Sequence, residues 1–298
     1  MMTAPVQSQQ RGELRRDEPL TRYNTWRVGG HARQMYLPAD IEDLAGFLVT
    51  LPANEPLLWL GLGSNLLIRD GGFAGTVILL QKSVNTIEVR RDRVWVEAGA
   101  ACAKVARECA RAGLTGAAFL AGIPGTMGGA LAMNAGAFGG ATWPIVEAVT
   151  TIDRHGVTRK RTPADFIVAY REVRGAVDEW FVDCTLRLEH GDVAAEQAAI
   201  RSLLDRRAAT QPTGQPSCGS TFRNPPGDHA ARLIEASGLK GYRVGGAEVS
   251  PKHANFIINT GSATADDIEA LIAHVRDEVE RQHGVRLQTE VHMVGERA

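Results

Sequence analysis

Apolar side chains recur at intervals of three and four residues in four segments of the chain, and this period predicts amphipathic helices. The helices are expected over residues 40–51, 101–112, 194–209 and 264–283. The last has the clearest boundaries, because Thr264 and Asp267 form a capping start and Gly284 is a residue type at which helices commonly end. Its apolar stripe from Ile268 to Val279 predicts that one face of this helix is buried.

Shorter apolar runs, several of which alternate with polar residues, predict β-strands. They cover residues 59–60, 66–68, 76–80, 86–89, 94–97, 149–152, 157–161, 181–188 and 286–294. The turn His155-Gly156 separates two of these strands and favours a hairpin. In the last strand, Leu287 and Val291 alternate with Glu290, so the carboxylate is expected on the polar face.

The order of these elements predicts an α+β fold, since strands adjoin one another as hairpins more often than they alternate with long helices. The composition changes after Gly191, and the Pro- and Gly-rich segment 211–220 is the strongest candidate for a boundary between two units. Residues 1–19 lack an apolar run, so a flexible tail is expected there rather than a signal peptide.

The chain is close to electrical neutrality. Its 298 residues include 33 Lys and Arg and 34 Asp and Glu, which gives a formal net charge of −1. Non-specific nucleic-acid binding is not expected, because it relies on a basic surface. The four cysteines form no C-x-x-C pair, so reduced thiols in a cytoplasmic protein are expected. Residues 112–146 carry no charge, but their glycines and prolines argue against a membrane helix.

Glycine is the compositional feature that bears on function, with 32 residues, about 11% against the usual ~7%. Much of it falls in three turns, residues 24–30, 61–72 and 121–136, where Gly is interleaved with Asn, Ser and Thr. Such turns offer unhindered backbone N–H groups that hold a pyrophosphate; the alternative is a set of tight turns without a ligand. The second turn has Leu66 where a dinucleotide fingerprint needs its third glycine, so a Rossmann site is not favoured.

These turns and further segments, in this order, resemble the UDP-N-acetylenolpyruvoylglucosamine reductase family of flavoenzymes. The match extends over residues 20–296 and rests on N-T-W-R-V-G-G, G-L-G-S-N-L-L-I-R-D-G-G, A-G-I-P-G-T-M-G-G-A, G-S-T-F-R-N-P and K-H-A-N-F-I-I-N. The resemblance implies an FAD-binding domain of the vanillyl-alcohol-oxidase (PCMH) type over residues 20–195, with lobes at about 20–82 and 83–195. A smaller α/β substrate-binding domain is then expected over residues 196–298, with its last strand, 286–294, returning to the flavin site.

The resemblance also implies a reaction. NADPH reduces a non-covalently bound FAD, and hydride from the flavin N5 then adds to the vinyl CH2 carbon of UDP-N-acetylglucosamine enolpyruvate. The adjacent carbon takes a proton, which gives UDP-N-acetylmuramate for peptidoglycan synthesis. The protein must therefore bind a carboxylate, stabilise an enolate and donate a proton.

Three residues match the family's catalytic positions. The resemblance assigns Arg171 to the substrate carboxylate and the enolate, Ser220 to proton donation, and Glu290 to the enolic intermediate. Considered alone, these are a surface arginine, a turn serine and a solvated strand carboxylate. Spacing alone does not choose among Ser217, Ser220 and Thr221. The chain also departs from the family after Arg171. The family often has a serine two residues after this arginine, but here Arg171 is followed by Glu-Val-Arg.

The resemblance also implies residues that bind the flavin and the substrate. Those at the flavin are Gly61, Gly63, Ser64, Asn65, Gly122, Ile123, Pro124, Gly125, Gly128, Gly129, Asn134 and Gly136. Those at the substrate are Tyr170, Arg223, Asn224, Lys240 and His253, with Arg232 as a further candidate. No metal ligand set is expected. The short connection between Arg174 and Trp180 leaves no room for a tyrosine-bearing lid loop, which is typical of the family's shorter subclass.

Two alternatives remain open. One is an oxidase or 2-hydroxy-acid dehydrogenase on the same flavin fold; the other is a nucleotide-binding protein without catalysis. Arg171, Ser220 and Glu290 together favour the reductase, because oxidation of a hydroxy acid begins by removal of a substrate proton. The family further implies a cytoplasmic monomer whose partners are small molecules, with no nucleic acid and no membrane.

Overall fold

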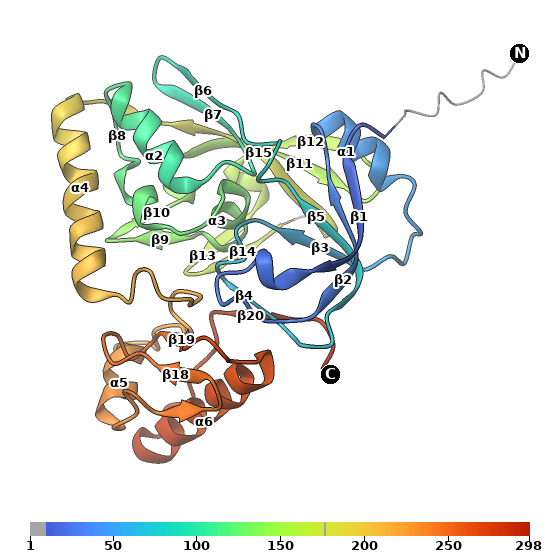
Figure 1. Cartoon of the computed structure of the whole chain (residues 1–298). Helices are drawn as coiled ribbons and strands as arrows, with labels where there is room; N and C mark the ends of the chain where they lie inside the picture. Colours follow the sequence, from blue (N-terminus) through green and yellow to red (C-terminus); the bar gives the residue numbers. More distant parts are fainter. Residues whose placement is uncertain (1–9, 176) are drawn as a thin grey trace, which may run out of the picture.

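The computed structural model describes residues 10–175 and 177–298, which form two larger sheets and a smaller C-terminal unit (Figure 1). The first sheet has the order β1-β2-β5-β3. Its strands are β1 (Glu13–Pro19), β2 (His31–Leu37), β5 (Phe73–Leu79) and β3 (Leu57–Leu60). β2, β5 and β3 are parallel, and parallel neighbours need a crossover. Helix α1 (Ile41–Leu48) lies in the connection from β2 to β3.

The expected flexible tail over residues 1–19 is wrong in its second half. β1 pairs antiparallel with β2 from Glu13 opposite Leu37 to Pro19 opposite His31. The strand has the sequence E-L-R-R-D-E-P and lies at the sheet edge, where charged residues face solvent, so no apolar alternation reveals it. Residues 1–9 lie outside the described residues.

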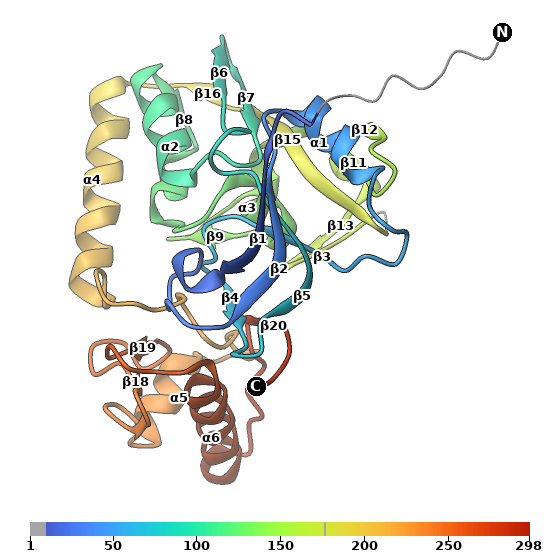
Figure 2. The same cartoon turned by 45° about the vertical axis from the view of Figure 1, so that its right-hand side comes forward.

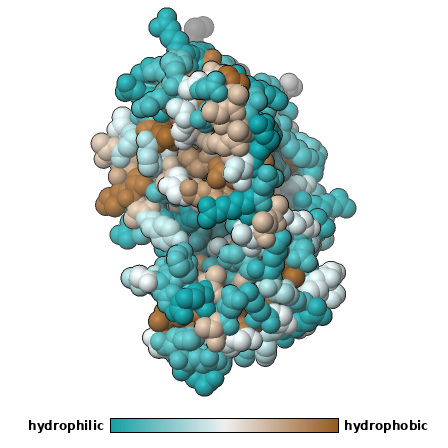
Figure 3. Space-filling view, turned by 90° about the vertical axis from the view of Figure 1, so that its left-hand side faces the viewer, coloured by the Kyte–Doolittle hydropathy of each residue, from teal (hydrophilic) through white to brown (hydrophobic). Residues whose placement is uncertain are grey.

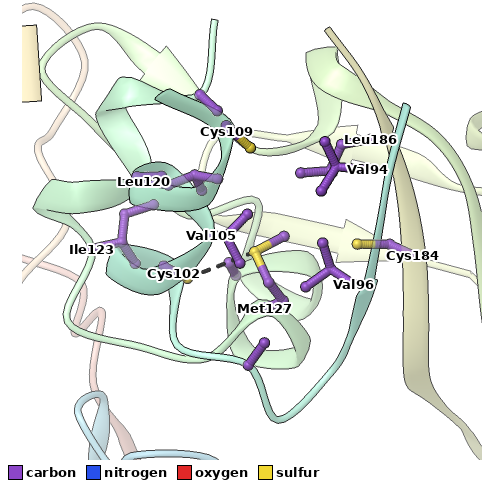
Figure 4. Close-up of a cluster of buried hydrophobic side chains, with 14 of the residues drawn as sticks. Val94, Val96, Cys102, Val105, Cys109, Leu120, Ile123, Met127, Cys184 and Leu186 are labelled. Atoms are coloured by element: carbon purple, nitrogen blue, oxygen red, sulfur yellow. Dashed lines mark hydrogen bonds between the residues drawn. The ribbon is translucent and has the colours of Figure 1, made fainter. Parts of the chain in front are cut away.

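The second sheet is antiparallel throughout and has the order β12-β11-β15-β7-β6. Its strands are β12 (Thr158–Arg161), β11 (Val146–Asp153), β15 (Glu179–Arg187), β7 (Arg93–Glu97) and β6 (Ile87–Arg90). α2 (Cys102–Arg111) and α3 (Met127–Met133) pack on it, and Figure 4 shows their side chains facing those of β7 and β15. Cys102, Cys109 and Cys184 are buried as free thiols in this core.

Helix α4 (Val193–Thr210) belongs to this second sheet's unit, which corrects the expected domain boundary at residue 196. It packs against α2 and η2 (Ala118–Gly122), and Ile200 joins the same hydrophobic core. Figures 1 and 2 both show α4 beside α2 and apart from the C-terminal unit. The chain therefore leaves the first two sheets at the Pro- and Gly-rich segment that begins with Gln211.

The C-terminal unit is a small three-stranded sheet with two helices. Its elements are α5 (Ala230–Ala236), β17 (Arg243–Val244), β18 (Ala247–Val249), β19 (Ile257–Asn259) and α6 (Ala265–His283). The predicted features of α6 are confirmed: Thr264 and Asp267 form a capping box, Gly284 has a φ of 68°, and the apolar stripe is buried. Hydrophilic residues cover most of this unit on the face seen in Figure 3.

Strand β4 (Leu66–Ile68) and the side chain of Trp26 both join the C-terminal unit to the N-terminal part of the chain. β20 (His292–Val294) pairs parallel with β4, so the chain does return toward the second glycine-rich turn, but only the end of the expected strand 286–294 is a strand. Trp26 is fully buried in the core of the C-terminal unit, and its Nε1 donates to the Ile257 carbonyl at 2.8 Å. The unit is therefore docked by side chains from the N-terminal segment.

The remaining elements are short. They are η1 (Leu20–Arg22), β8 (Leu114–Thr115), β9 (Gly136–Ala137), β10 (Gly140–Ala141), η3 (Trp143–Ile145), η4 (Pro163–Asp165), β13 (Ile167–Ala169), β14 (Glu172–Arg174) and β16 (Glu189–His190). The four expected helices and the other expected strands all form, with ends displaced by a few residues. Within the described ranges, no helix combines the length and apolarity that crossing a membrane requires.

Candidate active site

Two of the glycine-rich turns meet. Residues 61–65 follow β3, and residues 122–129 lead into α3. A Cβ at Gly61 would lie 2.5 Å from Thr126 Oγ1, and one at Gly125 would lie 3.7 Å from Ser64 Oγ, so the two loops touch. Gly63 has a φ of +59°, and a Cβ there would collide with a backbone carbonyl, so only glycine fits this path.

Several backbone N–H groups of these loops are available to a ligand. In the described part of the chain, the N–H groups of Ser64, Asn65 and Gly125 have no hydrogen-bond partner. The N–H of Gly128 is used instead, because it donates to the Ala98 carbonyl at 2.8 Å. Unpaired backbone donors are costly when buried, and neighbouring ones form an anion-binding concavity. The loops therefore fit the diphosphate of a dinucleotide, with Gly128 contributing close packing rather than a donor.

A cavity of about 280 Å³ lies beside the loops, with Gly61 and Gly129 in its wall. Trp59 and Trp180 line it and stack on each other, with ring centroids 5.0 Å apart. The buried Trp59 Nε1 has no hydrogen-bond partner among the described residues, so an indole donor is available to a bound molecule. A mainly apolar cavity with one unused donor fits part of a nucleotide. Sequence analysis missed both tryptophans, although Trp59 stands just before the glycine-rich turn.

Arg171 and Glu290 form an ion pair at the other side of the loops. Arg171 lies at the turn of the β13–β14 hairpin with a φ of 55°, and its Nε is 2.9 Å from Glu290 Oε1. Its Nη2 donates to the Gly136 carbonyl at 3.0 Å. The two side chains are 20% and 12% exposed, so the pair is largely shielded from water. The structure thus joins two residues that lie 119 positions apart in the chain (290 − 171).

Glu290 experiences two opposing effects on its pKa. Burial raises the pKa, and the charges of Arg171 and Arg223 lower it, with burial the larger effect, so the pKa is above its ordinary value. Burial lowers the pKa of the His292 imidazole, and the positive charge of Arg223 lowers it further. Arg223 Nε is buried and has no partner within the described residues. Two guanidinium groups thus flank one carboxylate, which leaves positive charge for an anionic ligand.

Ser220 reaches this cluster through backbone pairing. Glu290 N–H donates to the Thr221 carbonyl at 2.8 Å, and Arg223 N–H donates to the Gln288 carbonyl at 2.9 Å. The segment after Ser220 therefore lies beside the segment that carries Glu290. Ser220 itself is half-buried and precedes the first of these pairs. This placement follows from the fold, and no local pattern in the sequence indicates it.

Asn65 connects the glycine loops with the carboxylate. Its Nδ2 donates to the Glu290 carbonyl at 3.1 Å, and its own carbonyl accepts from His292 N–H at 3.1 Å. The same Nδ2 lies 3.0 Å from Met133 Sδ at the end of α3. The unused N–H groups, the ion pair and the serine therefore surround one region. His292 was missed by sequence analysis, although it shares the polar face of the last strand with Glu290.

Other expected site residues have structural contacts. The Asn134 side chain accepts from Trp143 N–H and donates to the Ala169 carbonyl, which ties α3 to the hairpin that carries Arg171. Asn224 Oδ1 accepts from Ala230 N–H and so caps α5. Both amides hold the frame of the site in place.

The last expected residues lie on different parts of the surface. Lys240 pairs with Glu235 at 2.6 Å, and His253 Nδ1 accepts from Asn255 N–H, so neither contacts the arginine–carboxylate cluster. Tyr170 is 56% exposed and lies beside Arg171, whose Cζ is 5.3 Å from its ring centroid. The other loop residues stay with the turns, and no further contact distinguishes them. These are Gly122, Ile123 and Pro124 before α3 and Gly136 after it.

Two families match this chain. Residues 32–160 match the family described as an FAD binding domain, and residues 211–294 match the C-terminal domain of UDP-N-acetylenolpyruvoylglucosamine reductase. The second match begins where the structure places the boundary between the units. The first lies within the two sheets and includes both glycine loops.

Whole-chain comparisons agree with the domain matches. The UDP-N-acetylenolpyruvoylglucosamine reductase of Alkalilimnicola ehrlichii is 61% identical over 99% of both chains, and that of Methylococcus capsulatus is 58% identical over 96% of this chain and 94% of its own. The crystal structure of the Thermus caldophilus enzyme superposes with a TM-score of 0.83 at 33% identity, over 96% of this chain and 99% of its own. The α+β fold with a PCMH-type FAD-binding domain and the short length of the chain agree with these relatives. The chain therefore belongs to the UDP-N-acetylenolpyruvoylglucosamine reductase family and is an FAD-binding oxidoreductase.

Proposed function

We propose that this chain reduces the enolpyruvyl ether of UDP-N-acetylglucosamine to UDP-N-acetylmuramate, a peptidoglycan precursor, with NADPH as the reductant. The observation that carries the proposal is the shielded Arg171–Glu290 pair next to Ser220, beside loops whose free N–H groups suit a dinucleotide. The close relatives of the chain are named for reduction of this enolpyruvyl compound. When bound, the reduced flavin supplies hydride to the vinyl CH2 carbon of the substrate.

Arg171 and Arg223 bind the carboxylate end of the substrate in this proposal. A guanidinium keeps its charge at all relevant pH values and pairs with a carboxylate through two parallel N–H groups. Addition of hydride places negative charge on the substrate enolate, and fixed positive groups stabilise that charge strongly where water is excluded. The buried Arg223 Nε, which has no partner in the described chain, supports this role.

Ser220 and Glu290 handle the proton. The Ser220 hydroxyl donates a proton to the carbon next to the new C–H bond, and the positive charge of Arg171 and Arg223 favours the serine alkoxide that results. Glu290 stands beside Arg171, and its raised pKa lets the carboxyl hold a proton at a higher pH than an exposed glutamate does. It then acts on the enolic form of the substrate from the same side as the arginine.

A stopped-flow experiment separates the two halves of this reaction. In Ser220→Ala, we expect flavin bleaching by NADPH to proceed within about twofold of wild type, because no proton from Ser220 is involved. Recovery of the flavin colour on adding UDP-N-acetylglucosamine enolpyruvate should slow by about a hundredfold or more, the usual contribution of a positioned proton donor.

Ser217→Ala is the matched control, because it removes a hydroxyl from the same turn and should leave both steps unchanged. Equal slowing of both steps in Ser220→Ala would reject the proton-donor role. Failure of the wild-type protein to recover its colour would reject the substrate. Monomeric state and cytoplasmic location belong to the same proposal, and sedimentation and cell fractionation test them.

A further inference from the structure

Arg69 and Asp70 belong to the second glycine-rich turn, yet their side chains contact helix α6 of the C-terminal unit. Both Asp70 carboxylate oxygens accept from the start of α6, Oδ1 from Ala265 N–H and Oδ2 from Asp266 N–H, each at 3.1 Å. A carboxylate at this end of a helix pairs unused N–H donors and interacts favourably with the helix dipole. Asp70 therefore caps a helix that lies about 195 positions further along the chain (265 − 70).

Arg69 holds the next turn of the same helix. Its Nε and Nη2 donate to the two carboxylate oxygens of Glu269 at 2.8 and 3.0 Å, and Arg297 also contacts that carboxylate. Glu269 is 16% exposed, and these contacts lower its pKa to about 2. A bidentate arginine–carboxylate pair fixes distance and orientation together, which a single exposed ion pair does not.

The backbone of the same segment sets the register of the chain near Glu290. Residues 66–68 pair with residues 292–294, and Arg69 N–H donates to the Val294 carbonyl at 2.9 Å. Gly71 N–H donates to the Glu296 carbonyl at 2.9 Å, and Asn65 contacts the Glu290 carbonyl at the opposite end. The ladder therefore has the contacts of Arg69 and Asp70 with α6 at one end and the contact of Asn65 with the Glu290 carbonyl at the other. Figure 2 shows its two strands, β4 and β20, next to each other.

We propose that Arg69 and Asp70 are positioning residues for catalysis. Their contacts with the start of α6 hold the C-terminal unit so that Glu290 and Ser220 face the flavin loops. The inference rests on the proposed function, which gives Glu290 and Ser220 their catalytic roles. The docking of α6 is a property of the fold and does not depend on that function. Small displacements of reacting groups are costly to a reaction, by up to a hundredfold for about 1 Å. Loss of either side chain is expected to loosen the ladder without removing any group that touches substrate.

The test compares Asp70→Ala, Asp70→Asn and Glu269→Gln in the flavin-loaded protein. Asp70→Asn keeps one acceptor for the helix, so it separates loss of the cap from loss of the side chain. Glu278→Gln is the control, because Glu278 pairs with Arg281 on the same helix at a more exposed place. Hydrogen exchange is followed for residues 65–72 and 290–296, and stopped-flow reoxidation is measured at saturating enolpyruvyl substrate.

Asp70→Ala should reduce exchange protection in both segments about fivefold, as expected for loss of a helix cap. In Asp70→Ala, flavin reoxidation at saturating substrate should slow about tenfold or more. The rates of Asp70→Asn and Glu269→Gln should lie between those of Asp70→Ala and wild type. Glu278→Gln should have the wild-type rate. Unchanged protection in all three variants would overturn the docking role. Reduced protection with a wild-type reoxidation rate would overturn the positioning role.

The outcome stays distinguishable from failure of the proposed function. If wild-type protein does not reoxidise with the enolpyruvyl compound, the proposed substrate is wrong, while the exchange measurement still decides whether Arg69 and Asp70 dock α6. If Asp70→Ala does not fold, exchange and reoxidation are compared in Asp70→Asn and Glu269→Gln, for which smaller effects are expected.

Discussion

At the scale of single residues, the site depends on how Glu290 is surrounded. A glutamate in a strand, considered by itself, is an ordinary surface residue, and only the family resemblance singled out Glu290. The fold buries it, places Arg171 at 2.9 Å and adds Arg223, so burial and charge act on its pKa in opposite directions. Arg171 also adopts a positive φ, which is uncommon for a residue with a side chain and a mark of functional positions.

The raised pKa of Glu290 predicts a stability difference that depends on pH. A carboxyl whose pKa is higher in the folded state adds stability below its unfolded pKa, near 4.5, and loses this contribution as pH rises through the folded value. The free energy of unfolding of wild type minus that of Glu290→Gln should therefore be smaller at pH 7.5 than at pH 4. Urea unfolding of both flavin-free proteins, followed by tryptophan fluorescence, measures this. A difference that is constant with pH would contradict the burial effect.

At the scale of elements, the three glycine-rich turns do different work. The first, residues 24–30, docks the C-terminal unit through Trp26, whose carbonyl also accepts from Asn259 Nδ2 at 2.9 Å. The second continues from the free N–H groups at Ser64 into the β4 ladder and Asp70. The third brings Gly125 against the second turn. The sequence predicted phosphate binding for all three turns, with tight turns that hold no ligand as the alternative.

Two glycine substitutions separate these roles. Gly125→Ala adds a methyl in ordinary contact with Ser64 and Ile123, so the free energy of unfolding should change by less than about 1 kcal/mol. In the proposed diphosphate loop, the methyl would stand between the backbone and the phosphate, so FAD affinity should fall about tenfold. Gly63→Ala needs a positive φ and collides with a carbonyl, so it should unfold at markedly lower urea.

Gly214→Ala is the control for backbone strain alone, since its φ is +91° and a Cβ there meets nothing within 4 Å. This substitution should lower the free energy of unfolding by about 1 to 2 kcal/mol and leave FAD affinity unchanged. Flavin fluorescence titration and urea unfolding give both quantities. Wild-type FAD affinity in Gly125→Ala would remove that loop from the cofactor site.

At the scale of the whole molecule, the two units share a core. Trp26, Val28 and Leu67 come from the N-terminal segment and are buried among side chains of residues 218–291. The β20 strand also has its partner outside the C-terminal unit. Each large apolar side chain contributes about 1.5 to 3 kcal/mol on burial, a large part of the stability of a small domain.

A fragment of residues 211–298 should therefore not form a stable fold by itself. It keeps its own helices and β17–β19 but lacks the side chains that fill its core and the strand that pairs with β20. An NMR spectrum with narrow amide dispersion and rapid hydrogen exchange is expected. A well-dispersed spectrum of this fragment would show that the docking contacts are dispensable to its folding.

The sequence by itself determined the local elements. Helix α6, with its capping box and stripe, and the sheet hairpins follow from periodicity and turn residues, which act over a few positions. The charged edge strand β1 does not follow from periodicity. An edge strand that is exposed to solvent needs no alternation of apolar and polar residues. The resemblance supplied the family, and the comparisons confirmed it.

Only the tertiary structure brings residues that lie far apart in the chain into contact. Arg171, Glu290 and the segment that carries both Ser220 and Arg223 come from three parts of the chain. Their proximity depends on the pairing of residues 221–223 with 288–290 and on the β4–β20 ladder. The boundary at Gln211 agrees with the Pro- and Gly-rich segment 211–220 that the sequence indicated, and the packing of α4 on α2 shows that residues 193–210 come before it. Periodicity describes the neighbours of a residue along the chain, whereas burial, pKa and ion pairing depend on neighbours that only the folded chain provides.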